Sequence, residues 1–343
     1  MGFKQRQCAA AIAAVAVTGA WTGSAHGATV AVDGDVIAYQ AASGEANALT
    51  VRDDGVAVSF SDAGAGIQPG AGCVALPTGD AACLGGPTQL AVSVGDRDDS
   101  VDAETNILNE IRIDGGTGDD TLHSGSASGR LHELDGGSGD DELTTAVNII
   151  GTQVLSGGAG NDSAWAQGGG FGELIGGSGH DSLRYTQRVP GQAPSRMDGA
   201  SGNDTYRWEG PDPFDDDFAA RAIAPGDDFD TLRVDLGPFG SGVTVDLAAC
   251  HGCVDRVIGS DLDDVLLGDG RVNVLEGRGG NDTIDPRGGL DAVAGGAGDD
   301  TIMLRDRLPD LVTCGDGDDT VRADGRLLDH VGESCETVLR SAS

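Results

Sequence analysis

The sequence predicts an all-β fold built from short repeats that follow one another along the chain. Its first indication is a nonapeptide, Gly-Gly-x-Gly-x-Asp-x-(apolar)-x, which recurs nine times in exact or slightly altered form. The second is the apolar eighth position, which would start a short strand after each glycine-rich turn; repetition at a fixed period is typical of stacked architectures with a shared core. The third is a formal net charge of -35, because many of the acids fall on repeat positions five and six.

The nine copies form two groups. The first group starts at Gly115, Gly136, Gly157, Gly176 and Gly199, and the second at Gly259, Gly277, Gly295 and Cys314. Starts in the second group are 18, 18 and 19 residues apart, which is two nonapeptides per step, and degenerate copies fill the intervals. Steps of 21, 21, 19 and 23 residues in the first group predict insertions that bulge out between its strands.

Each repeat position has a physical role. Glycines allow the positive φ angles of a tight turn, which exposes carbonyl oxygens, and the sixth-position aspartate adds charged oxygens to the same turn. A calcium ion takes about six to eight oxygen ligands, so two turns must stack to enclose it. A disordered acidic linker is the alternative, but it would not hold apolar residues at one phase of the repeat, as found at Leu122, Leu143, Leu183, Leu266, Ile284, Ile302 and Val321.

This pattern resembles the RTX, or haemolysin-type, calcium-binding repeat family. The resemblance covers roughly Val94 to Arg322 and implies a parallel β-roll, a form of β-solenoid, with Ca²⁺ between stacked turns. We expect two roll blocks, residues 94–207 and 259–322. Five turns would give four sites and four turns three, so up to about seven ions are expected on one ligand-rich edge. Clustered carboxylates repel until an ion neutralises them, so binding and folding should be one event.

The sixth-position aspartates are the expected calcium ligands, with glycine carbonyls completing each shell. They are Asp120, Asp141, Asp162, Asp181, Asp204, Asp264, Asp282, Asp300 and Asp319. Fifth-position residues are weaker candidates, because their side chains could instead brace the turn: Asp119, Asp140, Asn161, Asn203, Asp263, Asn281, Asp299 and Asp318. On the other edge of the second block, Asp291 and Asp310 hold the sixth position and predict weaker sites, whereas Asn273 replaces the carboxylate.

The segments outside the repeats predict caps, a processing signal and an insertion. Residues 1–27 have the basic, apolar and small-residue regions of a secretory signal peptide, which predicts an extracellular protein without a membrane span. Residues 28–93 predict a β-rich N-terminal cap that shields the first coil, as solenoids require. The repeat breaks down over 208–258, which predicts a lateral insertion or a hinge between two rolls, and 323–343 predicts a C-terminal cap.

Loss of the signal would remove Cys8 from the seven cysteines and leave six, an even number suited to an oxidising compartment. Among the possible connectivities we predict the sequence-local one: Cys73–Cys83, Cys250–Cys253 and Cys314–Cys335. A zinc or redox role for the Cys-His-Gly-Cys run is disfavoured, because no second ligand pair and no thioredoxin-like strand–helix context surrounds it.

Composition and motifs favour a calcium-binding protein that is not an enzyme. The charge of -35 argues against nucleic acid or an anionic membrane as partner. No nucleophile elbow, zinc-protease helix or EF-hand loop occurs in the sequence. Two alternatives stay open. One is a structural or adhesive surface component that uses the roll as a spacer and self-associates or contacts the cell surface. The other is a β-solenoid enzyme acting on polysaccharide, with Asp215 to Asp217 and Asp246 as its only candidate acids.

Overall fold

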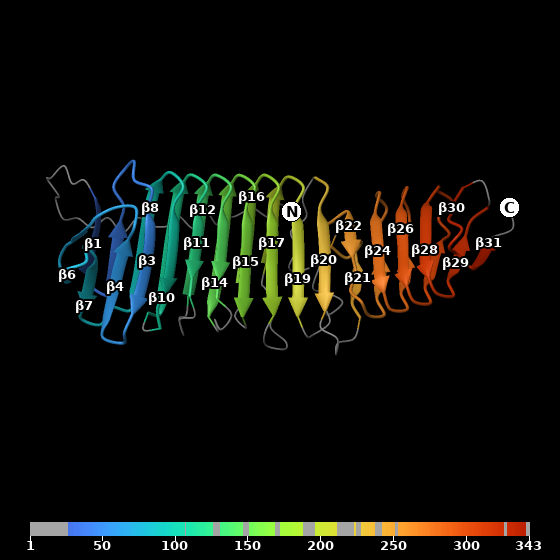
Figure 1. The fold of residues 1–343 in the computed structure, drawn as a ribbon. Coiled ribbons are helices and arrows are strands. Elements are labelled where there is room, and N and C mark those ends of the chain that lie inside the picture. Colours follow the sequence, from blue (N-terminus) through green and yellow to red (C-terminus); the bar gives the residue numbers. More distant parts are fainter. Residues whose placement is uncertain are drawn as a thin grey trace, which may run out of the picture.

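The computed structural model describes residues 27–106, 108–125, 131–146, 151–168, 172–187, 196–210, 223, 228–236, 242–250, 253–325 and 328–340. The predicted signal peptide, except Gly27, and the acids Asp215 to Asp217 lie outside these residues. All regular elements of the described residues are β-strands, stacked side by side along one elongated solenoid (Figure 1). No described helix is long and apolar enough to cross a bilayer.

The strands follow one another in four groups. The N-terminal cap contains β1 (Ala28–Asp33), β2 (Val36–Gln40), β3 (Ala48–Asp53), β4 (Ala57–Asp62), β5 (Ile67–Pro69), β6 (Cys73–Ala75) and β7 (Ala81–Leu84). The first block contains β8 (Gln89–Asp96), β9 (Ser100–Glu104), β10 (Glu110–Thr117), β11 (Thr121–Ser124), β12 (Leu131–Ser138), β13 (Glu142–Thr145), β14 (Thr152–Ala159), β15 (Ser163–Gly168), β16 (Gly172–Ser178), β17 (Ser182–Gln187), β18 (Arg196–Ser201) and β19 (Thr205–Gly210). The junction contains β20 (Thr231–Leu236) and β21 (Thr244–Asp246). The second block contains β22 (Arg256–Ile258), β23 (Val265–Leu267), β24 (Val274–Gly279), β25 (Thr283–Asp285), β26 (Ala292–Ala297), β27 (Thr301–Leu304), β28 (Leu311–Asp316), β29 (Thr320–Ala323), β30 (His330–Val331) and β31 (Thr337–Arg340).

Three sheets form the two faces of the roll. Sheet A has the order β18-β16-β14-β12-β10-β8-β2-β1-β5, and sheet C, which covers the same face farther along the chain, has the order β21-β23-β25-β27-β29-β31. Sheet B has the order β30-β28-β26-β24-β22-β20-β19-β17-β15-β13-β11-β9-β3-β4-β7-β6 and runs along the other face through both blocks. Each coil therefore places one strand in sheet B and one in sheet A or C.

The register places each repeat directly over the next. Leu122 pairs with Leu143 in sheet B, and Ile302 pairs with Val321 in sheet C, both in parallel ladders. All the apolar eighth-position residues named above are buried in a single core. Every side chain of this phase therefore points inward, because strand side chains alternate between the two faces of the sheet. The predicted all-β parallel β-roll is confirmed.

The N-terminal cap closes the first coil by antiparallel pairing. β1 pairs with β2, and β3 with β4, in two hairpin-like pairs, while β2 and β3 each pair in parallel with the first roll strands β8 and β9. The disulfide Cys73–Cys83 joins β6 to β7 at the outer end of the cap. The parallel ladders thus pass into short antiparallel strands, which limits the free sheet edge at this end.

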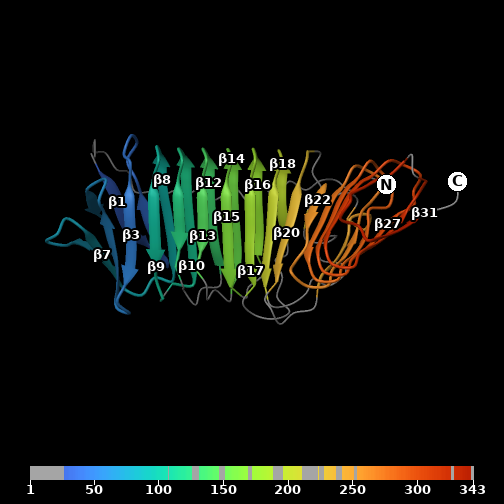
Figure 2. The same ribbon diagram turned by 45° about the vertical axis from the view of Figure 1, so that its right-hand side comes forward.

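Between the two blocks, one face of the roll changes from sheet A, which ends at β18, to sheet C, which begins at β21, while sheet B continues. β20 pairs in parallel with β19 over six residue pairs and then with β22, so sheet B continues across the whole segment. Asp230-Thr231-Leu232 keeps the aspartate and the apolar residue of the repeat, although Pro225 and Asp228 replace the glycines of positions one and four, and this suffices for one more coil. Seen from the direction of Figure 2, the second block appears as nested rings while the first block still shows its strands lengthwise, so the axis changes direction near the junction.

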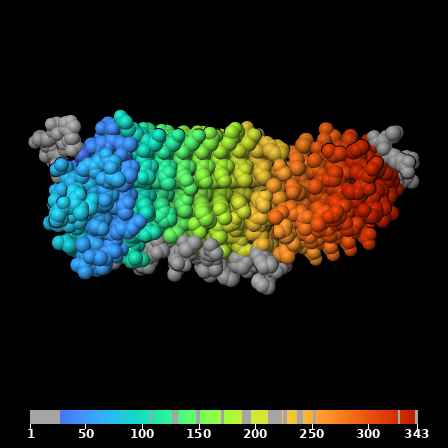
Figure 3. Space-filling model, in the orientation of Figure 1, coloured from blue at the N-terminus to red at the C-terminus, as the bar shows by residue number. Residues whose placement is uncertain are grey.

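The C-terminal end continues the roll and is held by a disulfide. β30 and β31 add one strand each to sheets B and C, and Cys314–Cys335 ties this last coil to the preceding one. The third disulfide, Cys250–Cys253, lies between β21 and β22. The three bonds are those of the sequence-local pairing. The space-filling view in Figure 3 shows the resulting rod, with the second block continuing the first.

Candidate calcium-binding edges

Two long edges run along the roll where the chain passes between its faces. At the first edge the chain turns from sheet A or C into sheet B, and at the second edge it turns from sheet B into sheet A or C. Strong repeats of the first block, such as the turn between β10 and β11, lie at the first edge. Those of the second block, such as the turn between β24 and β25, lie at the second edge. The expectation of one ligand-rich edge is corrected: the strong turns change edges at the junction, because coils of the second block begin their repeat half a coil later.

A ladder of hydrogen bonds links the sixth-position aspartates of the first edge. The Oδ1 atom of Asp120 accepts the backbone N–H of Asp99 at 2.8 Å, and Oδ1 of Asp141 accepts that of Asp120 at 2.8 Å. The contact repeats from coil to coil at 2.8–3.1 Å, through Asp162, Asp181, Asp204, Asp230 and Asp255. One carboxylate oxygen of each aspartate is therefore occupied by the fold itself.

The second edge has a separate ladder of the same kind. It starts where Oδ1 of Asp264 accepts the backbone N–H of Val243 at 2.7 Å, and it ends where Oε2 of Glu336 accepts that of Asp319 at 3.0 Å. Between them, Asp282 and Asp300 accept from the preceding coil at 2.7 and 2.8 Å. The same hydrogen bond, from a backbone N–H to the aspartate of the neighbouring coil, therefore links the coils on both edges. The turns of the first edge lead into sheet B, and those of the second edge lead out of it.

The second carboxylate oxygen is buried and free in most of these residues. Within the described part of the chain, Oδ2 has no hydrogen-bond partner in Asp99, Asp120, Asp141, Asp162, Asp181, Asp282, Asp291, Asp300, Asp310 and Asp319. A buried charged oxygen without a partner costs several kcal/mol or more, so such a column is unstable unless a cation or a proton compensates it.

These free oxygens face a space kept open by the first glycine of each repeat. A methyl group on Gly115 would collide with Oδ2 of Asp120 and would lie 2.7 Å from the carbonyl oxygen of Gly136 in the next coil. A carboxylate oxygen of one coil and a carbonyl oxygen of the next therefore converge on one point. The same convergence occurs at Gly259, Gly277 and Gly295 on the second edge. Hard oxygen donors from two stacked turns are the donor set that calcium prefers, so the residues fit this ion.

Burial makes the columns electrostatically strained. It raises the pKa of Asp120 to about 7; the backbone N–H of Asp99 counteracts this, and the charges of Asp141 and Asp99 add to the rise. On the second edge, burial and the neighbouring acids raise the pKa of Asp282 to about 7 in the same way. Divalent cations between the turns would offset both the cost of burying the charged oxygens and the repulsion between neighbouring carboxylates.

Asp264 departs from this arrangement. Its Oδ2 accepts the backbone N–H of Ser260 at 2.6 Å, and its Oδ1 accepts the Ser260 hydroxyl at 2.9 Å. Leu262 stands here at the fourth position, where most other copies have a glycine. The first turn of the second edge therefore satisfies its own carboxylate, and Asp264 has less to offer a cation than the other predicted ligands.

The fifth-position side chains lie outside the turn and brace it. Oδ1 of Asp119 accepts the backbone N–H of Asp140 at 2.8 Å, and Oδ1 of Asp299 accepts that of Asp318 at 2.9 Å. His180 does the same with Nδ1, which accepts the N–H of Asn203 at 2.8 Å. Contacts of this kind also involve Asp140, Asn161, Asn203, Asp263 and Asn281. Of the two roles predicted for this position, the geometry favours the brace.

Comparison with known families agrees with this geometry. The model of the RTX calcium-binding nonapeptide repeat matches the chain in four copies, at residues 112–130, 150–170, 258–293 and 287–304. The chain carries RTX repeats. The first two matches contain turns of the first edge, and the last two contain strong turns of the second edge. This family binds calcium, which indicates a calcium-binding repeat protein. No curated protein matches the chain.

The RTX pattern missed four carboxylates that belong to the edges. Asp230 and Asp255 continue the ladder of the first edge across the junction, and burial raises the pKa of Asp230 to about 6. The register places Asp329 and Glu336 at equivalent positions in the last coil. Glu336 accepts the N–H of Asp319 from the preceding coil, whereas Asp329 accepts that of Asp324. None follows a glycine pair, but each is the first residue of an acid-x-apolar triplet, and this weaker signal could have found them.

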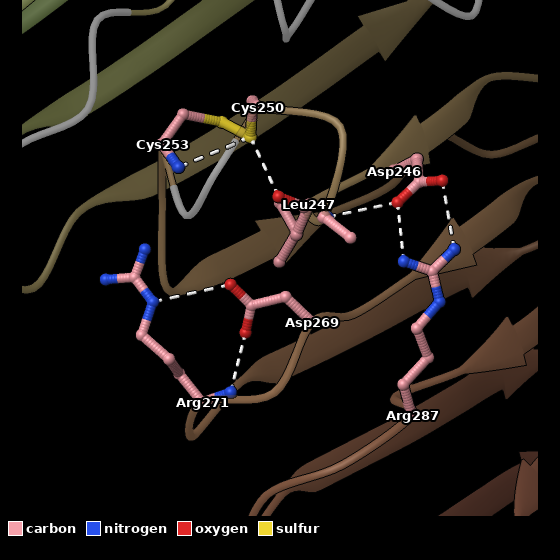
Figure 4. The surroundings of a disulfide bond; sticks show 8 residues. Asp246, Leu247, Cys250, Cys253, Asp269, Arg271 and Arg287 are labelled. Carbon is pink, nitrogen blue, oxygen red and sulfur yellow. Dashed lines mark hydrogen bonds and ion pairs between the residues drawn. A yellow bond between two sulfur atoms is a disulfide. The ribbon is translucent and has the colours of Figure 1, made fainter.

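Two other groups of acids lie outside the RTX turns and already have arginine partners. Asp246, the described candidate for a polysaccharide-acting site, accepts 2.7 and 2.9 Å hydrogen bonds from Arg287, as Figure 4 shows. Arg287 holds the pKa of Asp246 below its usual range, whereas a general acid needs a raised one. A second cluster joins Asp102, Glu104 and His123, but its two carboxylates are paired with Arg52 at 2.6 and 3.5 Å.

Proposed function

We propose that this protein is a secreted calcium-binding module whose roll folds when Ca²⁺ enters its stacked turns. The free, buried Oδ2 atoms carry this proposal, because ten such oxygens in register need a positive charge at neutral pH. When bound, calcium supplies that charge and accepts the carbonyl oxygens that the glycine turns expose.

The residues of the chain divide the remaining work. Oδ1 of each sixth-position aspartate holds the neighbouring coil, and Oδ2 points to the cation, so the same side chain couples stacking to binding. Fifth-position side chains keep the turn closed from outside. Because the unfolded chain has no such convergence of oxygens, calcium should bind mainly to the folded state and stabilise it by mass action.

Secretion is supported by the signal-like sequence of residues 1–27 and by the three disulfides, which form in oxidising compartments. A role as a structural or adhesive spacer outside the cell is compatible with the same module, and the rod shape in Figure 3 favours it. Sedimentation velocity with calcium would support the spacer role if the rods associate end to end or side by side.

Far-UV circular dichroism during a calcium titration tests the main proposal. The chain from Ala28 onward should change from coil to β-structure with calcium, return with chelator, and respond weakly to magnesium, which demands tighter octahedral geometry. Equilibrium dialysis would count the bound ions. An unchanged spectrum with no bound calcium would show that the repeats serve only as a structural solenoid.

A further inference from the structure

Most of the described arginines in this acidic chain have an acidic partner. The sequence holds 56 acids against 21 basic residues, so an arginine without an ion pair stands out. Among the described residues, those without an ion pair are Arg97, Arg305, Arg307, Arg322 and Arg340. Those that do are Arg52, Arg112, Arg184, Arg196, Arg207, Arg233, Arg256, Arg271, Arg278 and Arg287.

Two of these arginines, Arg305 and Arg322, line the same hollow. Its volume is about 320 Å³, and its walls are Asp285, Arg287, Met303, Arg305 and Arg322. Met303 and Arg322 are register partners on the neighbouring strands β27 and β29, and Asp285 ends β25 of the same sheet. Arg287 and Arg305 come from the turns that follow β25 and β27. The hollow therefore lies where the outer face of sheet C meets the first edge, and its volume is within the range of small-molecule sites.

The charges in this hollow are arranged for an anion. Arg287 is held by Asp246 and by the carbonyl oxygen of Gly268 at 2.9 Å, so its own charge is neutralised and its position fixed. Asp285 accepts the backbone N–H of Arg287 at 3.0 Å through Oδ1. The guanidinium groups of Arg305 and Arg322 leave the hollow with a net positive charge in a chain whose total is -35.

We propose that this hollow binds a hydroxylated organic anion of the size of one acidic sugar unit. The forks of Arg305 and Arg322 would hold its carboxylate or sulfate by charge-assisted hydrogen bonds. Asp285 would accept a hydroxyl through its second oxygen, and the Met303 thioether would contact the apolar face of the ring. This goes beyond calcium-driven folding, because none of the five lining residues is a sixth-position aspartate; it assigns the folded roll a ligand-binding face.

Isothermal titration calorimetry of calcium-saturated protein at low ionic strength tests the proposal. Sodium galacturonate is the probe, galactose tests the need for the charge, and sodium sulfate tests the need for the hydroxylated ring. Galacturonate should bind, and both galactose and sulfate should bind at least about tenfold more weakly. Arg322→Gln and Arg305→Gln should each weaken galacturonate about tenfold or more, as loss of one charge-assisted contact implies.

Arg112→Gln is the matched control, because it removes the same charge from a half-buried, outward-facing strand position on sheet A of the first block. It should bind galacturonate like the unaltered protein. Circular dichroism with calcium is recorded first for every variant. A roll that folds with calcium but ignores galacturonate, or an Arg322→Gln variant that binds it equally well, overturns the inference and leaves the calcium function standing. Sedimentation velocity is run in parallel. Self-association that is lost in Arg322→Gln, without galacturonate binding, would also overturn the inference and assign the hollow to an acidic surface of a second copy.

Discussion

The two blocks of the roll carry the same repeat, yet they are stabilised in different proportions by their core and by their edges. One coil of the first block consists of the eight-residue strand β10 and of β11, and it buries Ile111, Ile113 and Leu122. One coil of the second block consists of β24 and of the three-residue β25, and the buried apolar side chains of these two strands are Leu275 and Ile284. In this pair of coils the difference of one aliphatic side chain is worth roughly 1.5–3 kcal/mol. The number of buried aliphatic side chains varies within each block, and the difference between the whole blocks lies in Tyr185, Tyr206 and Trp208, which the first block buries and which have no aromatic counterpart in the second.

The edges also differ between the blocks. Among the residues that the structure describes, the buried aspartates of the first block lie on the first edge, whereas the second block has free Oδ2 atoms on both edges, in Asp291 and Asp310 on one side and in Asp282 and Asp300 on the other. Each block has five described aspartates with a free Oδ2, but in the second block they lie on both edges of a thinner core. Where the core is large, calcium at the turns adds to a stability that the core largely provides. Where the core is small, calcium at the turns has to provide part of that stability, so the folding of the two blocks should depend unequally on calcium.

Calcium removal should therefore open the second block first, and this is the largest effect that we expect. As chelator is added, amides of Ile284 and Ile302 should lose their protection from hydrogen exchange at a higher free calcium concentration than those of Ile113 and Leu134. Hydrogen exchange with mass spectrometry resolves the two blocks. If both open at one calcium concentration, the roll is a single cooperative unit and the proposed division between core and edges is wrong.

Acidity should partly replace calcium in the metal-free protein. Burial raises the folded pKa of Asp120 and Asp310 to about 7 and that of Asp300 to about 6, above the usual value of 3.8. The folded state then holds more protons than the unfolded state between those values, so stability is greatest near pH 4 and falls as pH rises to about 7. The slope is up to about 1.4 kcal/mol per pH unit for each such group.

Urea unfolding of calcium-depleted protein at pH 5 and pH 8 measures this effect, which both blocks should share because burial raises the pKa of repeat aspartates in each. With saturating calcium the protein should instead be more stable at pH 8 than at pH 5, because protons compete with calcium for the carboxylates. Equal midpoints at both pH values without calcium would show that the buried carboxylates are ionised and compensated by some other means.

Much of this fold could be predicted from residue patterns alone, because period and burial are local properties. The apolar eighth position fixed the inward face at Leu122 and Ile302, and the sequence-local cysteine pairs agree with the three disulfides. The roles of positions five and six also follow from their places in one turn.

The change of edges could not be predicted, because it depends on where each coil begins relative to the sheets. The copies at Gly115 and Gly277 read alike, but one enters sheet B and the other leaves it. The ladder positions at the junction were missed for a different reason: Asp230 and Asp255 keep their place in the ladder without the glycine pair and the fourth-position glycine of the repeat. Stacking against a formed neighbour holds these turns, and no local motif records that contact.

Substitution of one sixth-position carboxylate in each block would sharpen the comparison. Asp282→Asn and Asp141→Asn keep an oxygen that can accept the ladder hydrogen bond, but they remove the charge. With calcium each should lose stability, by about 2.7 kcal/mol if one ion bound at a hundredfold excess over its Kd is lost. Without calcium each should gain stability, because a buried charge is gone. Thermal unfolding with and without calcium gives both signs, and a loss in both conditions would show that the carboxylate serves the ladder alone.

The smallest expected effect separates brace from ligand at position five. Asp299→Ala removes the acceptor for the N–H of Asp318 and should cost about 1 kcal/mol, the usual net value of one exposed hydrogen bond. Asp299→Asn should be nearly neutral, because asparagine already braces the equivalent turn at Asn281. Asp140→Ala is the matched change in the first block, where the larger core should make the same loss less damaging to calcium-induced folding. Calcium stoichiometry should stay unchanged in all three variants. If Asp299→Asn loses a bound calcium ion although its side chain still accepts the brace hydrogen bond, the fifth-position carboxylate is a calcium ligand. The charge of that residue, rather than its hydrogen bond, would then stabilise the turn.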